Sequence, residues 1–137
     1  FRRVLFRSGV CLGVPLLATG LSLRSKTLQV AGALLLAFSL GGFCFFSLFM
    51  VVPRLAGWAS RMLLTLALGC AIWSMHHAGP HTMGVARGAV PRLYTRPRME
   101  HIHGLLNALG FSLLGLLAWV AAGRAELSAS KRVEDVR

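Results

Sequence analysis

Residues 99–123, MEHIHGLLNALGFSLLGLLAWVAAG, decide the fold of this chain, because a cluster of ionisable residues runs directly into a charge-free segment. Residues 104–123 carry no charge over twenty positions, and at about 1.5 Å per residue a helix of this length spans a hydrocarbon core of roughly 30 Å. This stretch therefore predicts a transmembrane helix. At its start, Glu100, His103 and Asn107 are spaced i, i+3 and i+7, so one helical face carries three polar groups into the membrane boundary.

Three further apolar segments precede this helix. We predict an all-α, polytopic integral membrane protein with four transmembrane helices at about residues 9–23, 27–52, 60–78 and 103–123. The second segment has no charge over twenty-six residues, which is longer than the membrane core requires, so we expect it to tilt or to bend at Gly41 and Gly42.

The polar connections between the segments differ in length. Gly79 and Pro80 are expected to stop the third helix, which makes residues 78–102 a long polar loop, and loops of this length are more often functional than plain linkers. Residues 124–137 are predicted to be a solvated, partly disordered charged tail. Lys and Arg are evenly distributed between the two sides of the predicted topology, so the positive-inside rule gives no orientation.

The composition supports a membrane protein. Of 137 residues, 55% are hydrophobic and 14% are charged, and the mean hydropathy is +0.67. The formal net charge is +11, but the basic residues lie in the breaks between apolar segments, so the expected partner is the lipid bilayer with its anionic headgroups and not nucleic acid. The arginines predicted to contact headgroups are Arg87, Arg92, Arg96 and Arg98, and a specific site for an anionic substrate is the alternative.

The first eight residues, FRRVLFRS, can be back-translated into the end of a common sequencing-library adapter. We expect residues 1–8 to be a non-biological scar, residues 9–123 to form the helical transmembrane domain, and this domain to be the C-terminal part of a longer protein. Helices upstream of the chain are therefore expected partners.

All five histidines lie on one membrane face in the predicted topology. Three interpretations are open: a metal or haem site, a polar substrate site or proton relay, and interfacial histidines bonded to backbone or water. The candidate metal ligands are His76, His77, His101 and His103, and the candidate polar site combines His103, Asn107, Glu100 and His76. The three cysteines are scattered singly, without a CxxC motif. The sequence identifies no cofactor.

Small residues form a seam along the last predicted helix. Gly104, Ala108, Ser112 and Gly115 are spaced i, i+4, i+8 and i+11, and such seams let helix backbones approach closely. We expect the helix to pack along this seam. Asn107 lies one turn inside the membrane core, where it either bonds to a neighbouring helix or faces a cavity with His103.

The segment HGLLNALGF at residues 103–111 resembles the C-terminal signature of YndJ-like membrane proteins. The resemblance rests on His103, Gly104, Asn107, Ala108, Gly110 and Phe111. It implies a bacterial polytopic membrane protein, sometimes described as a transporter, with more helices upstream. No catalytic residue is carried over from the family.

Three functions are consistent with these features: a transporter or permease-like module with a polar site at the mouth of the last helix, a metal- or haem-dependent membrane enzyme, and a non-catalytic packing or partner-binding module. The sequence contains no GxSxG, HExxH or phosphate-binding glycine loop, which argues against lipase, protease and kinase activities. An enzyme is therefore the less favoured interpretation.

Overall fold

The computed structural model describes the backbone of residues 2–89 and 96–134, and the side chains of residues 8–85, 87–89, 97–132 and 134. Within these residues the regular structure is helical. The elements are α1 (Arg2–Ser22), α2 (Lys26–Phe46), the π-helical η1 (Ser47–Val51), the 3-10 turn η2 (Val52–Arg54), α3 (Trp58–Arg87), α4 (Arg96–Leu105), the π-helical η4 (Leu106–Leu113) and α5 (Leu114–Glu134). The predicted all-α class is confirmed.

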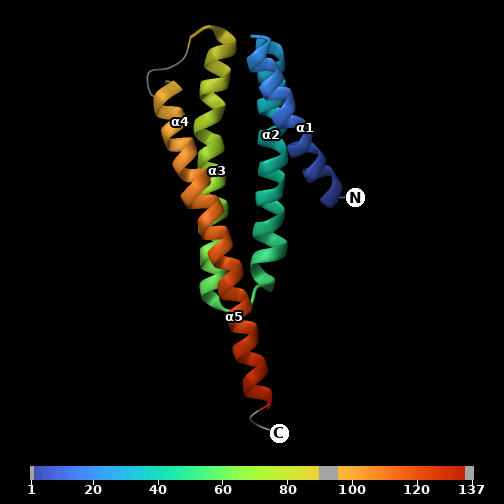
Figure 1. Ribbon diagram of the computed structural model, residues 1–137, viewed down its shortest axis with the longest axis vertical. Helices are drawn as coiled ribbons and strands as arrows, with labels where there is room; N and C mark the ends of the chain where they lie inside the picture. Colours follow the sequence, from blue (N-terminus) through green and yellow to red (C-terminus); the bar gives the residue numbers. More distant parts are fainter. Residues whose placement is uncertain (1, 90–95, 135–137) are drawn as a thin grey trace.

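Three helical segments are long and apolar enough to cross a membrane, namely Lys26–Arg54, Trp58–Val85 and Pro97–Arg132. A shorter apolar helix, Ser8–Ser22, precedes them, so the four predicted segments appear in the predicted order. Figure 1 shows them side by side along one axis, with α1 against α2, α2 beside α3, and the last helix crossing α3. The end of α1, the start of α2, the end of α3 and the start of α4 lie together at the upper end of the view.

Glycines bring α1 and α2 into backbone contact. A Cβ at Gly20 would lie 2.6 Å from the backbone nitrogen of Gln29, and a Cβ at Gly32 would lie 2.6 Å from that of Leu17. Both glycines are buried. In a membrane, where lipid is as apolar as the side chains, such close approach is a main source of helix association.

The irregular end of α2 follows from Pro53. The helix remains α-helical through Gly41 and Gly42, where we expected a bend, and it widens to the π-helical η1 just before the proline. A proline ring clashes with the carbonyl four residues earlier, here that of Phe49, and a wider turn moves this carbonyl away.

The prediction that Gly79 and Pro80 end the third helix is wrong. α3 continues through both residues to Arg87 and ends where Gly88 adopts a left-handed conformation with φ of 74°. The predicted loop at residues 78–102 is therefore mostly helix, and residues 90–95 of it lie outside the described residues. Proline is tolerated inside membrane helices because neighbouring groups satisfy the freed backbone.

The last helix extends beyond the predicted segment at both ends. α4, η4 and α5 follow one another without interruption, and α5 includes residues 124–134 of the predicted tail, whose described side chains are almost all exposed. The expected partial disorder is thus replaced by helix up to Glu134.

The buried core is small and lies between α3, α5 and the end of α2. It consists of Cys44, Leu55, Leu64, Leu68, Ala71, Ala118 and Ala122. Large apolar side chains instead cover the outside, including Phe38 at 77% exposed and Leu116 at 66%. This distribution fits a protein whose surroundings are lipid.

Candidate functional site

His103 joins the last helix to α3 through its Nδ1, and its Nε2 is hydrogen-bonded within the last helix. Nδ1 lies 2.7 Å from the Ser74 hydroxyl and 3.3 Å from the Ser74 carbonyl, and Nε2 lies 3.0 Å from the Asn107 amide nitrogen. Ser74 is fully buried. The polar triad formed by Ser74, His103 and Asn107 therefore connects α3, α4 and η4.

The triad can satisfy two protonation states of the imidazole. When Asn107 donates to Nε2, the ring proton sits on Nδ1 and points to Ser74, which gives a neutral ring. When the Asn107 amide turns over, its oxygen accepts from Nε2, and the charged ring keeps a partner on each side. The arrangement can thus gain or lose one proton while every ring nitrogen remains hydrogen-bonded.

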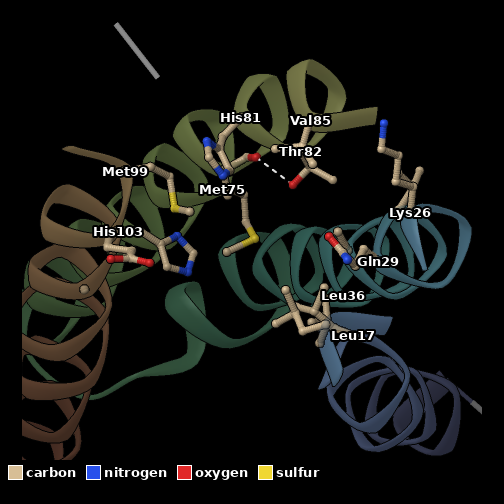
Figure 2. A pocket seen from close by; sticks show the side chains of 16 residues that line it. Leu17, Lys26, Gln29, Leu36, Met75, His81, Thr82, Val85, Met99 and His103 are labelled. Carbon is tan, nitrogen blue, oxygen red and sulfur yellow. Dashed lines mark hydrogen bonds between the residues drawn. The ribbon is translucent and has the colours of Figure 1, made fainter. Parts of the chain in front are cut away.

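A cavity of about 750 Å³ lies beside the triad, between α1, α2, α3 and α4. Figure 2 shows it from close by, with His103 and Met99 on one side, Met75 and His81 on another, and Gln29, Leu36 and Leu17 facing them. Its apolar lining includes Leu17, Val30, Leu36, Met75, Val85 and Met99, and its polar lining consists of Lys26, Gln29, His81, Thr82, Glu100 and His103. The volume lies within the range of about 300–1,000 Å³ that is typical of small-molecule sites.

The sequence-predicted polar site is partly assembled in the structure. Glu100 and His103 line the cavity, and Asn107 is hydrogen-bonded to His103. His76 lies elsewhere on α3, where it is exposed and its ring centroid is 5.6 Å from that of Trp73 and 5.9 Å from that of His77. On α3, the group that reaches His103 is Ser74.

The other histidines are distributed over two helices. His81, which we placed in a loop, lines the cavity from α3. The His77 ring packs on Trp73, and its Nδ1 lies 3.1 Å from the Trp73 carbonyl oxygen. His101 is exposed on α4.

The metal interpretation gains no geometric support. In the described part of the chain, no group of three or more His, Cys, Asp or Glu side chains is arranged to hold a metal ion, so the structure does not assemble His76, His77, His101 and His103 into one ligand set.

The predicted headgroup arginines are described only in part. Arg87, the last residue of α3, and Arg98, in the first turn of α4, are exposed. Arg96 begins α4 but its side chain is not among those described, and Arg92 lies outside the described residues.

The face of the last helix that packs on α3 is not the predicted seam. Gly104, Ala108 and Ser112 are exposed, and a Cβ at Gly104 or Gly115 would meet nothing within 4 Å. A Cβ at Gly110, by contrast, would lie 2.6 Å from both Cβ and Sγ of Cys70. The packed stripe runs through His103, Asn107, Gly110, Ala118 and Ala122.

Ser74 is the site residue that sequence reasoning missed. The sequence pattern that could have identified Ser74 is a stripe of small residues along α3. Ser60, Ala67, Ala71 and Ser74 recur every three to seven positions, and in the structure each is 1% exposed or less. Such a stripe marks the helix face that approaches a neighbour, and a hydroxyl on it is placed to bond across the interface.

A protein-family model described as YndJ-like protein matches residues 3–111. The match includes every residue that lines the cavity as well as all three members of the polar triad, and it ends at the last residue of HGLLNALGF. It also includes residues 3–8, which fall in the segment that resembles adapter sequence. A search of curated proteins and a search of solved structures each gave no match.

Proposed function

Because the chain belongs to the YndJ-like family, we propose that it forms part of a bacterial membrane transporter or permease-like module whose solute site is the cavity between α1, α2, α3 and α4. The observation that carries the proposal is the polar triad of Ser74, His103 and Asn107, whose central residue His103 lines this cavity.

Two physical arguments support this function. Ionisable residues inside membrane helices are costly, and those that persist usually face a cavity or a substrate pathway. His103 meets this description, since it lines the cavity and is bonded to neighbours on both sides. In addition, π-helical segments occur frequently at functional sites, and η4 begins directly after α4 and contains Asn107.

The test is transport by the intact protein in proteoliposomes. Internal pyranine would report proton movement after an acid jump, and electrical recording on a supported membrane would report charge movement with a panel of small carboxylates, phosphates and amino acids. We expect His103→Ala to lower the rate at least tenfold. The matched control is His101→Ala, which removes an exposed histidine two residues away and outside the cavity lining. Equal rates for the two variants, with both proteins folded, would leave His103 with a packing role only.

A further inference from the structure

We propose that the cavity binds a single-chain amphiphile with an anionic head group, of the fatty-carboxylate class. This inference rests on the proposed function, because it names the substrate class of the same site.

The depth of the cavity indicates a ligand that enters from the membrane boundary. Lys26 begins one candidate span and Val85 ends another, so both mark the same boundary. Leu36 and Met75 also line the cavity, each ten residues further into its helix, which corresponds to about 15 Å. The cavity therefore extends to about the middle of a 30 Å hydrocarbon core.

The lining changes character along this depth. The lining residues furthest from the boundary include the apolar Leu36 on α2 and Met75 on α3. His103 of α4 is the polar group at this depth, because it is bonded to Ser74, the residue next to Met75. Lys26 and Gln29 are at the mouth, and the Gln29 side chain donates to the Gly20 carbonyl at 3.1 Å, which fixes its position. A charged mouth above an interior that is apolar apart from His103 matches a ligand with one charged head and one hydrocarbon chain.

The charge at the mouth decides the sign of the head group. The helix ends that meet here carry the described cations Lys26, which lines the cavity, and the exposed Arg24, Arg87 and Arg98. Glu100 is the carboxylate among the lining residues. The excess of positive charge favours an anionic head over a cationic one. A small soluble anion would leave the apolar depth unused.

Photolabelling in the membrane tests the proposal. The probe is dodecanoate with a diazirine at mid-chain, added to the intact protein in phosphatidylcholine nanodiscs, and the labelled residues are mapped by mass spectrometry. We expect labelling to concentrate on Leu36, Met75 and their neighbours. Unlabelled dodecanoate should compete at least tenfold better than dodecanol or dodecyltrimethylammonium.

Two pairs of variants separate site binding from contact with bulk lipid. Leu36→Trp fills the cavity and should lower labelling at least tenfold, whereas Leu34→Trp, on the 46% exposed lipid side of the same helix, should not. Lys26→Glu should lower labelling at least fivefold, whereas Lys131→Glu, on the exposed part of α5, should not.

Several results would overturn the inference: uniform labelling of the lipid-facing residues, equal competition by dodecanol, or unlabelled cavity residues because another helix of the intact protein occupies the space. The proposed function has a separate readout. Transport that is insensitive to His103→Ala, together with site-specific labelling, would remove the transport role and keep the amphiphile site. Transport that depends on His103, without site-specific labelling, would keep the transport role and remove the amphiphile site.

Discussion

Replacing Gly110 with alanine should loosen the contact between η4 and α3. The added Cβ would lie 2.6 Å from Cβ and Sγ of Cys70, whereas ordinary contacts begin at 3.4 Å, so the two helices would have to separate by about 0.8 Å. Overpacking of this kind costs about 1–3 kcal/mol, and the better helix propensity of alanine returns about 0.5–1 kcal/mol. We expect a net loss of about 1–2 kcal/mol in the free energy of unfolding.

The same helix offers matched controls. A Cβ at Gly104 or Gly115 meets nothing within 4 Å, so Gly104→Ala and Gly115→Ala should be neutral or slightly stabilising. The measurement is reversible unfolding in mixed micelles, followed by circular dichroism as the fraction of sodium dodecyl sulfate rises. If Gly110→Ala is as stable as Gly104→Ala, the close approach of η4 to α3 is wrong and the predicted seam regains its place as the packing face.

Three further predictions follow from single contacts. Ser74→Ala removes the bond between α3 and His103, and Asn107→Leu removes the bond to His103 within the last helix. Each should cost about 0.5–1.5 kcal/mol of unfolding free energy; additive losses in the double variant would show that the two bonds are independent and contradict a shared triad. Gln29→Leu removes the bond to the Gly20 carbonyl and should speed amide hydrogen exchange of residues 23–25 several-fold, with unchanged exchange contradicting the contact. Pro80→Ala restores a donor inside α3 and should slow exchange of residues 81–87; faster exchange would show that the proline is required there.

The helical class and the number of apolar segments could be predicted from the sequence because they depend on length and charge alone. A segment of twenty uncharged residues has few alternatives to a membrane helix. The helix ends could not be predicted equally well. Pro80 reads as a stop by the rules for soluble helices, yet α3 continues for seven more residues beyond it, because in a membrane an unfolded backbone is costlier than one lost hydrogen bond.

The candidate site could be predicted only in part. His103 and Asn107 stood out because polar groups in an apolar helix require partners, and the structure gives each a partner. Ser74, the partner on α3, did not stand out, since a serine among other small residues does not by itself indicate a hydrogen bond to a neighbouring helix. The choice of His76 followed from the assumption that α3 ends near it, and the longer helix places Ser74 opposite His103 instead.

Two patterns in the sequence of the last helix compete to be the face that packs on α3: a seam of small residues and a stripe that contains the polar residues. The seam of Gly104, Ala108 and Ser112 and the stripe of His103, Asn107 and Gly110 are offset by between one and two residues on the same helix. Close packing along the seam would bring small residues together, but it would turn His103 and Asn107 towards lipid, and unsatisfied polar groups there cost several kcal/mol. The stripe satisfies both requirements, because Gly110 supplies the close approach next to the polar pair.

Because His103, Asn107 and Gly110 lie on the same stripe, the geometry of the polar triad depends on the contact between Gly110 and Cys70. His103 lies seven residues from Gly110, about 10 Å along the helix, and Ser74 lies one turn beyond Cys70 in the same direction. A separation of about 0.8 Å at Gly110 would therefore lengthen the 2.7 Å bond between Ser74 and His103 to beyond hydrogen-bonding range for a hydroxyl. We expect Gly110→Ala to impair transport as strongly as Ser74→Ala, although Gly110 does not line the cavity. Adding Cys70→Gly removes the clashing atoms and should restore both stability and transport. Restored stability without restored transport would show that the triad and the glycine contact are independent.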